Sequence, residues 1–139
     1  MIGKILKGKR AVVSVTTRTP VSEIVELLHH HRIGAVLVMD KGQIHGLVSE
    51  RDICAGLHNH GCTILEQPAS AVMSSPVITA SPHDSVSAAM AVMTDRRFRH
   101  LPIVDNGQLL GIVSIGDLVK YRIEAVEAEA AAMKDYIAS

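Results

Sequence analysis

The strongest constraint on the fold is an internal repeat. When the chain is shifted against itself by 65 residues (105 − 40), the run Asp40–Ser49 falls on Asp105–Ser114 without a gap, and Asp52 falls on Asp117. Such a match in a single register is typical of a duplicated unit, in which each copy is one supersecondary structure. The 139 residues therefore contain two copies of a unit of roughly 60 residues, a size that is marginal for independent folding.

Each copy predicts the order strand, helix, strand, strand, helix. β-branched runs at 12–15 and 77–80 predict the first strands. Thr19 and Asp84 are expected to be the N-caps of the helices that follow, with Pro20 at the first helical position of the first copy. The expected apolar stripes of these helices are Ile24, Leu27 and Leu28 in the first copy and Ala89, Val92 and Met93 in the second.

Two further strands in each copy are expected to form a hairpin before the second helix. Nearly continuous apolar runs at 35–39 and 101–104 suit strands that are covered on both faces. Gly42 and Gly107 stand in turns with hairpin chemistry, because glycine accepts a positive φ. The third strands are expected at 44–48 and 109–113.

The predicted fold is α/β, with two pseudo-symmetric β-α-β-β-α units that pack sheet to sheet and share a core, plus a C-terminal helix. The expected segments are a first unit at 8–60, a linker at 61–76, a second unit at 77–123 and a C-terminal helix extension at 124–139.

Composition argues against several classes of partner. Lys and Arg together number 14, as do Asp and Glu, so there is no net charge to hold nucleic acid or anionic lipid. One Phe and two Tyr leave few surfaces on which bases could stack. No apolar run approaches the ~20 residues of a membrane span, and the first residues lack the apolar stretch of a signal peptide. With only two cysteines, the sequence predicts a cytoplasmic protein without nucleic-acid or membrane partners.

Three motifs resemble one known family. The runs Gly46–Asp52 (GLVSERD) and Gly111–Asp117 (GIVSIGD) close the two copies, and Phe98–Asp105 (FRHLPIVD) enters a strand of the second copy. They resemble the motifs of cystathionine-β-synthase (CBS) domains, and the resemblance covers about residues 8–123. It implies two CBS units forming a regulatory module, not an enzyme, with AMP, ATP or NAD(H) as a regulatory ligand in the cleft, no required cofactor, and a homodimer. The first copy departs from the pattern at Gly34-Ala35, where the second has Arg99-His100.

Ser49 with Asp52, and Ser114 with Asp117, are the main candidate ligand-binding residues. A Ser followed three residues later by an acid is a helix-capping pattern, and capping alone would explain both pairs. A helix N-terminus also presents N–H groups to a phosphate, and a carboxylate suits the two hydroxyls of a ribose. The resemblance implies a ribose-binding Asp, so we expect capping and binding to coexist.

The cluster Arg96–His100 is the densest positive charge in the chain. Arg96 and Arg97 are expected only to end a helix, where cations are favourable. Arg99 and His100 are candidates for phosphate contact, since an Arg fork matches phosphate geometry and a protonated His adds a charged donor. Arg51 could serve similarly in the first copy.

An adenine ring needs an apolar slot more than special side chains, and the candidates for it are equally typical of a core. By resemblance, each site combines the Ser/Asp helix of one copy with the first strand of the other. The candidates are Val13, Ile33, Gly34, Ala35 and Ile112 around one site, and Leu47, Val72, Met73, Ile78 and Phe98 around the other.

Two groups of metal-ligating residues predict no standard metal site. His29, His30 and His31 point about 100° apart on a helix, so they cannot all bind one ion, and a favourable helix C-terminus explains them better. The run Cys54–Cys62 holds two cysteines and two histidines, His58 and His60, at a spacing that fits no standard zinc site. A metal or redox sensor built on this run is an alternative function.

The last segment carries an apolar seam of the coiled-coil type. Its members alternate in steps of four and three and are Val119, Ile123, Val126, Ala130, Met133 and Ile137. The seam is expected to pack either on its own module or against a partner subunit or protein.

No common catalytic motif is present. The sequence therefore predicts a regulatory adenine-nucleotide-binding module that signals through dimer or partner contacts. The alternative from another class is a ligand-free structural or protein-interaction module that uses the C-terminal helix.

Overall fold

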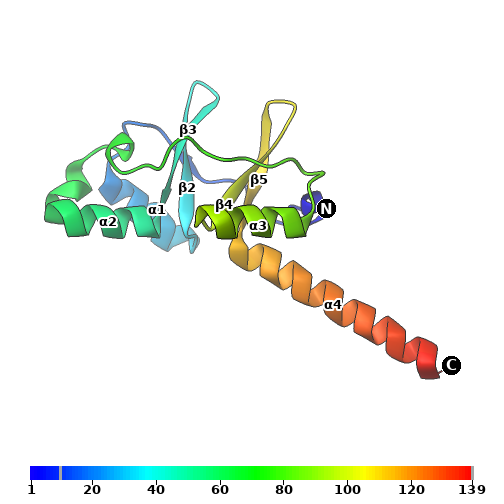
Figure 1. Ribbon diagram of the computed structural model, residues 1–139. Coiled ribbons are helices and arrows are strands. Elements are labelled where there is room, and N and C mark those ends of the chain that lie inside the picture. Colours follow the sequence, from blue (N-terminus) through cyan, green and yellow to red (C-terminus); the bar gives the residue numbers. More distant parts are fainter. Residues whose placement is uncertain (10, 139) are drawn as a thin grey trace. The chain divides into compact units, whose positions relative to one another are not determined.

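The computed structural model describes residues 1–9 and 11–138, which form two compact units. Residues 11–77 make the central unit, and residues 1–9 with 78–138 make the terminal unit. Figure 1 labels the helices and strands of both. The units correspond to the two sequence copies, except that the segment before each copy packs with the other copy. The chain thus exchanges its leading segments between the repeats.

The central unit has a three-stranded sheet in the order β1-β2-β3, with β1 parallel and β3 antiparallel to β2. Its elements are β1 (Ser14–Val15), α1 (Val21–His31), β2 (Ala35–Asp40), β3 (Gln43–Ser49), α2 (Glu50–His60) and two 3-10 helices, Gly61–Glu66 and Ala69–Ala71. The predicted linker therefore contains helical turns of its own and lies within the central unit.

The terminal unit repeats this order with a shorter first strand. Its elements are a 3-10 helix (Ile2–Lys4), α3 (Val86–Arg96), β4 (His100–Asp105), β5 (Gln108–Ser114) and α4 (Ile115–Ala138). Strands β4 and β5 are antiparallel, and the predicted first strand at 77–80 is reduced to a parallel bridge between Ala80 and Ile103. In the central unit, likewise, only two of the four residues predicted at 12–15 form β1.

The duplication is visible in the backbone of the two hairpins. Lys41 and Gly42 have φ values of 51° and 75°, and Asn106 and Gly107 have 51° and 78°. Two consecutive positive φ values are the mark of a type I′ turn, whose twist matches that of the flanking strands. Both predicted hairpins are therefore confirmed, with their glycines in the expected conformation.

Each unit has its own apolar core. In the central unit α1 contributes Ile24 and Leu28 to a cluster with Val36 and Val48 of the sheet. The core of the terminal unit includes Ile2, which is 0% exposed and whose N–H donates to the carbonyl of Asp84 at 3.0 Å. The N-terminal segment is thus an integral part of the terminal unit.

The predicted N-caps lie one residue too early. Helix α1 begins after Pro20, and α3 is capped by Ser85, whose Oγ accepts from the N–H of Ala88 at 3.0 Å. Thr19 and Asp84 instead close the preceding turns, where they accept from the N–H of Thr16 and of Ser81, each at 3.0 Å. Short polar side chains favour such local turns as readily as caps, which explains the error.

The apolar stripe predicted for α3 is also wrong at one position. Val92 is 38% exposed, whereas Ala89 and Met93 of the same helix are buried as expected. Helix α3 therefore buries a narrower face than its sequence predicts.

Within residues 1–9 and 11–138, no helix combines the length and the apolar character needed to cross a bilayer.

Candidate functional site

Helix α2 begins with a reciprocal cap made by Ser49 and Asp52. The N–H of Asp52 donates to Oγ of Ser49 at 3.2 Å, and the N–H of Ser49 donates to Oδ2 of Asp52 at 2.8 Å. The Ser49 hydroxyl also donates to the same carboxylate oxygen, at 3.0 Å. The predicted capping box is therefore present, and it fixes the carboxylate beside the first turn.

Helix α4 begins in the same way. The N–H of Ser114 donates to Oδ2 of Asp117 at 2.8 Å, and the N–H of Asp117 donates to Oγ of Ser114 at 3.1 Å. The N–H of Ile115, the first residue of the helix, donates to the carbonyl of Arg99 at 2.8 Å. In each unit, bonds of this kind hold the residues that lead into the middle strand (the strand entrance, before β2 or β4) against the start of the helix.

The two copies differ in the residues, and so in the charge, of the strand entrance. In the terminal unit His100 pairs in register with Ser114, so Arg99 and His100 lie beside the start of α4. Arg99 is exposed and His100 half-buried. The central unit has Gly34 and Ala35 at this place, and its nearest predicted cation is the exposed Arg51 in the first turn of α2. The terminal unit therefore brings together the predicted phosphate-binding residues with a Ser–Asp pair.

The carboxylate of Asp52 also binds a residue that the sequence analysis missed. Oδ1 of Asp52 accepts from the hydroxyl of Ser74 at 2.8 Å. The Ser74 backbone is held by Leu47 through two hydrogen bonds, one donated by each N–H, at 2.9 and 3.1 Å. Both oxygens of Asp52 are thus engaged inside the central unit.

Asp117 has an equivalent but charged partner. The ammonium group of Lys9 donates to Oδ2 of Asp117 and, at 2.9 Å, to the carbonyl of Ile112. Lys9 and Ser74 are related by the same 65-residue shift (74 − 9) as Asp52 and Asp117. The segments before the two copies share no identical residue at this shift (4–11 on 69–76), so the repeat gave no sequence signal for these two partners.

This environment shifts the titration of Asp117. Partial burial raises the pKa of the carboxyl group, but hydrogen bonds from Lys9 and Ser114, together with the positive charge of Lys9, outweigh it and hold the pKa below its ordinary value. The group is therefore firmly ionised at neutral pH. An ionised carboxylate accepts hydrogen bonds, as binding the hydroxyls of a sugar requires.

The residues predicted to form an apolar slot for adenine are divided between the two units. The central unit holds Val13, Ile33, Gly34, Ala35, Leu47, Val72 and Met73, and the terminal unit holds Ile78, Phe98 and Ile112. Ala35 is buried in the sheet, while the other residues are half-buried and lie at the edge of a core or beside it. The predicted combination of a helix start from one copy with the first strand of the other remains a prediction.

Two glycines let the exchanged segments lie close to the hairpins. A Cβ on Gly46 would lie 2.6 Å from Sδ of Met73, and a Cβ on Gly111 would lie 2.7 Å from Cδ2 of Leu6. Either contact is too close for a real Cβ atom. The glycines of the two motifs thus make room for the segments that carry Ser74 and Lys9.

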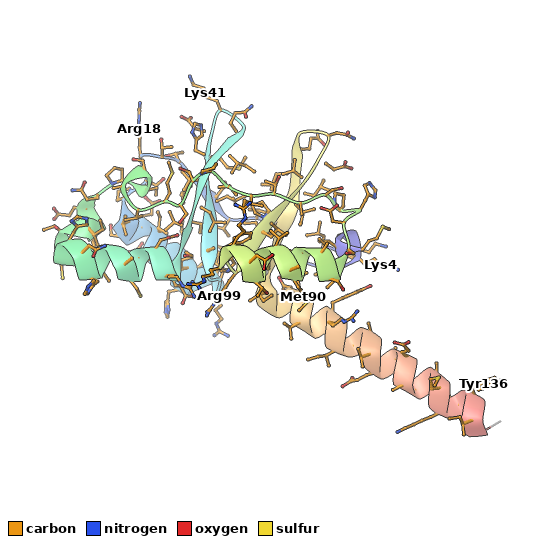
Figure 2. All side chains as sticks on the ribbon, viewed as in Figure 1. Lys4, Arg18, Lys41, Met90, Arg99 and Tyr136 are labelled. Atoms are coloured by element: carbon orange, nitrogen blue, oxygen red, sulfur yellow. The ribbon has the colours of Figure 1, made fainter. Side chains whose placement is uncertain are left out.

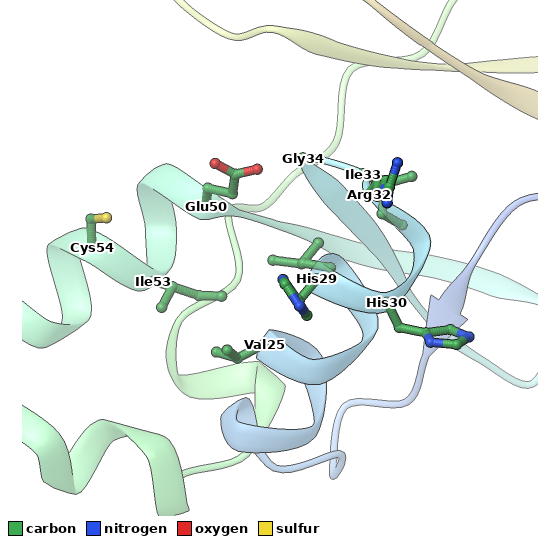
Figure 3. Close-up of a pocket in the computed structure, with 10 residues that line it drawn as sticks. Val25, His29, His30, Arg32, Ile33, Gly34, Glu50, Ile53 and Cys54 are labelled. Atoms are coloured by element: carbon green, nitrogen blue, oxygen red, sulfur yellow. The ribbon is translucent and has the colours of Figure 1, made fainter.

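A separate hollow of about 780 Å³ lies between α1 and α2 (Figure 3). Its wall is apolar at Val25, Leu28 and Ile53, with Glu50 and Cys54 beside them. Asp52 is on the other side of α2, because each residue turns the helix by about 100°. Only Ile33 and Gly34 of the predicted ligand-binding residues line this hollow.

The histidine and cysteine groups remain on the surface. His29, His30 and His31 occupy the last turn of α1, as predicted, and Cys54 and Cys62 are exposed free thiols. In the part of the chain that the structure describes, no three His, Cys, Asp or Glu side chains are placed to hold one metal ion.

Comparison with known proteins identifies the repeat. A family model described as CBS domain matches residues 4–59 and 69–124. The CBS domain-containing protein YhcV of Bacillus subtilis is 34% identical over 107 residues, which is 77% of this chain and 76% of YhcV.

Solved structures agree with this match. The CBS-domain containing protein ATU1752 from Agrobacterium tumefaciens is 37% identical, with a TM-score of 0.84 over 87% of this chain and 98% of that one. The CBS domain protein PAE2072 from Pyrobaculum aerophilum, solved in complex with AMP, is 30% identical, with a TM-score of 0.74 over 84% of this chain and 88% of that one.

Proposed function

Because the chain belongs to the CBS-domain family, with two such domains in tandem, we propose that it is a regulatory module for an adenosine-containing ligand. The ribose hydroxyls are bound by the carboxylates at the two helix starts, Asp52 and Asp117. The observation that carries this proposal is the identical construction of the two starts, each with a carboxylate fixed by a Ser cap. The AMP complex of the 30%-identical relative supports the ligand class.

The two helix starts have different preferences for phosphate. Arg99 places positive charge, and His100 an imidazole donor, beside the Ser114–Asp117 pair, so this end suits AMP, ATP or NAD(H). Gly34 and Ala35 add no charge beside the Ser49–Asp52 pair. The cation predicted for this pair is the exposed Arg51 in the first turn of α2, so a ligand with fewer phosphates, or adenosine itself, is better matched to the Ser49–Asp52 pair.

Regulation follows from differential affinity. A ligand that fits one arrangement of the chain better than another shifts the population toward that arrangement, and no chemical step is needed. The change is transmitted through a homodimer or a protein partner.

Calorimetric titration with adenosine, AMP, ATP and NADH tests the proposal. Asp117→Ala is expected to weaken binding of the preferred nucleotide at least tenfold, or about 1.4 kcal/mol. Asp95→Ala, a change of an exposed carboxylate near the end of α3, serves as the matched control and keeps the affinity of the parent protein. Circular dichroism verifies that both variants are folded.

One observation favours the second candidate, a ligand-free interaction module. Both carboxylates already have partners within their own units, Ser74 on Asp52 and Lys9 on Asp117. If none of the four ligands binds the parent protein, the interaction module replaces the nucleotide sensor. If Asp117→Ala binds them as tightly as the parent protein does, Asp117 is not the ribose-binding carboxylate.

A further inference from the structure

Helix α4 continues well beyond the core of the terminal unit. Leu118 is its one fully buried side chain among the described residues, and every residue from 122 to 138 is exposed. Figure 2 shows the side chains of this stretch, with Tyr136 labelled near its end. Most helical stability in proteins comes from packing an apolar face, so a helix this exposed lacks its usual support.

The exposed stretch has one apolar face. Val119 is 39% exposed, Ile123 is 52%, Met133 is 61% and Ile137 is 78%. With Val126 and Ala130 they form the seam predicted from the sequence, which the described part of the chain leaves uncovered. In heptad notation Val119, Val126 and Met133 take position d, and Ile123, Ala130 and Ile137 take position a.

The charges that flank the seam indicate what covers it. Position g holds Arg122, Glu129 and Tyr136, and position e holds Lys120, Glu127 and Lys134. In a parallel, in-register pair, each g residue meets the e residue five positions later on the other helix. Arg122 then meets Glu127 and Glu129 meets Lys134, so both kinds of contact join opposite charges.

The antiparallel arrangement gives the opposite result. When the a and d layers of two antiparallel copies are fully overlapped, Glu127 and Glu129 each face their own counterpart, and Lys120 faces Lys134. Like charges in such positions are destabilising and act against this pairing. The charge pattern is therefore selective for a parallel arrangement of identical chains.

We propose that α4 binds α4 of a second copy of this chain as a short parallel coiled coil that begins near Val119. Ala130 at an a position lets the two helices approach closely in the middle of the seam. The twofold axis of the coil runs along the paired helices, so any other contact between the two copies shares that axis. This pairing does not depend on the identity of the nucleotide.

Disulfide trapping in the full chain tests the pairing and its direction. In a background where the native thiols are removed by Cys54→Ser and Cys62→Ser, Ala130→Cys places a thiol in the seam. Ala128→Cys places one at position f on the outer face and is the matched control, because both changes replace an exposed alanine on the same helix. Mild oxidation is expected to convert most of the Ala130→Cys protein, and little of the control, to a covalent dimer.

Charge reversal supplies a second test, which uses the same trapping as its readout. Arg122→Glu with Glu129→Lys reverses position g, and Glu127→Lys with Lys134→Glu reverses position e, each without changing the net charge. Either pair of changes makes both contacts repulsive and is expected to reduce trapping through Ala130→Cys at least fivefold. A mixture of the two variants restores opposite charges and is expected to restore trapping as a heterodimer.

Three results overturn the proposal. Equal trapping at the two cysteine positions shows that the seam is not the contact, and no trapping shows that another protein or surface covers it. Trapping between Ala130→Cys and Val126→Cys, but not of Ala130→Cys with itself, shows an antiparallel pair.

Discussion

Lys9, from the segment before the first repeat, places its ammonium group on the carboxylate of Asp117 at the start of α4. The equivalent contact at the start of α2 joins the carboxylate of Asp52 to the neutral hydroxyl of Ser74. The two helix starts are therefore alike in geometry and different in charge. Both residues are hydrogen-bond donors, which is what the hydroxyls of a bound ribose would also be.

Removing the Lys9 side-chain charge is expected to tighten the binding of adenosine. The ammonium group and the ribose hydroxyls compete for the same carboxylate, so Lys9→Met leaves Asp117 available. The exposed ion pair is worth at most about 1 kcal/mol, which corresponds to a gain of about fivefold in affinity. Calorimetry on Lys9→Met and on the exposed control Lys7→Met measures the difference. Equal affinities in the two variants would show that Lys9 does not compete.

The pH dependence of Asp117 follows from its lowered pKa. The pKa of Asp117 is lower in the folded protein than in the unfolded chain, so the ionised carboxylate stabilises the fold. This contribution is fully present above the unfolded-state pKa and is lost as the pH falls through the folded-state pKa. Lys9→Met removes the neighbouring charge and a hydrogen bond, so the carboxyl group is expected to titrate at a higher pH. A carboxyl-carbon NMR titration of both proteins checks this shift. A midpoint that stays in place would assign the lowered pKa to Ser114 alone.

Arg99 is expected to act on the phosphates and not on the nucleoside. Arg99→Gly gives the terminal unit the residue found at the equivalent position of the central unit, Gly34. Losing one charged contact is expected to weaken ATP binding about tenfold and to leave adenosine binding within twofold. Arg96→Gly is the control, since Arg96 belongs to the end of α3. Titration with ATP and with adenosine separates the contributions, and an equal loss of affinity for both would indicate a purely structural role.

Most of the fold could be predicted from the sequence because the repeat constrains both copies at once. Hairpin chemistry and apolar runs located β2 to β5 within two residues, and the Ser–Asp spacing located the starts of α2 and α4. The helix caps were misplaced because Thr19 and Asp84 have turn and cap propensities that the sequence cannot separate.

The exchanged segments could not be predicted by local reasoning. Which copy a segment packs on is decided by tertiary contacts, such as Ile2 in the terminal core and Met73 over Gly46. Ser74 and Lys9 belong to these segments, so the two carboxylates could be predicted from the Ser–Asp spacing and their partners could not.

The cap at the start of α2 is expected to stabilise the central unit. Ser49→Ala removes the hydroxyl that accepts from the N–H of Asp52 and donates to its carboxylate, at a cost of about 1 kcal/mol. For a chain of this size, that corresponds to a fall of about 4 °C in the melting temperature. Ser22→Ala, at an exposed site in α1, is the control and is expected to change little. Differential scanning calorimetry measures both, and an unchanged Tm for Ser49→Ala would contradict the cap's contribution.

Gly111 is expected to control the position of the segment that carries Lys9. A Cβ at this residue would lie 2.7 Å from Cδ2 of Leu6, so Gly111→Ala must displace the end of the Leu6 side chain. Because that side chain is half-buried and can rotate, the expected cost is about 1 kcal/mol, the lower end of what overpacking costs. Leu6→Ala removes the atom that clashes. The double variant should therefore be less destabilised than the sum of the two single changes, and urea unfolding of the four proteins gives this coupling. Strict additivity would show that Leu6 does not pack over Gly111, and the Lys9 contact would then need a different support.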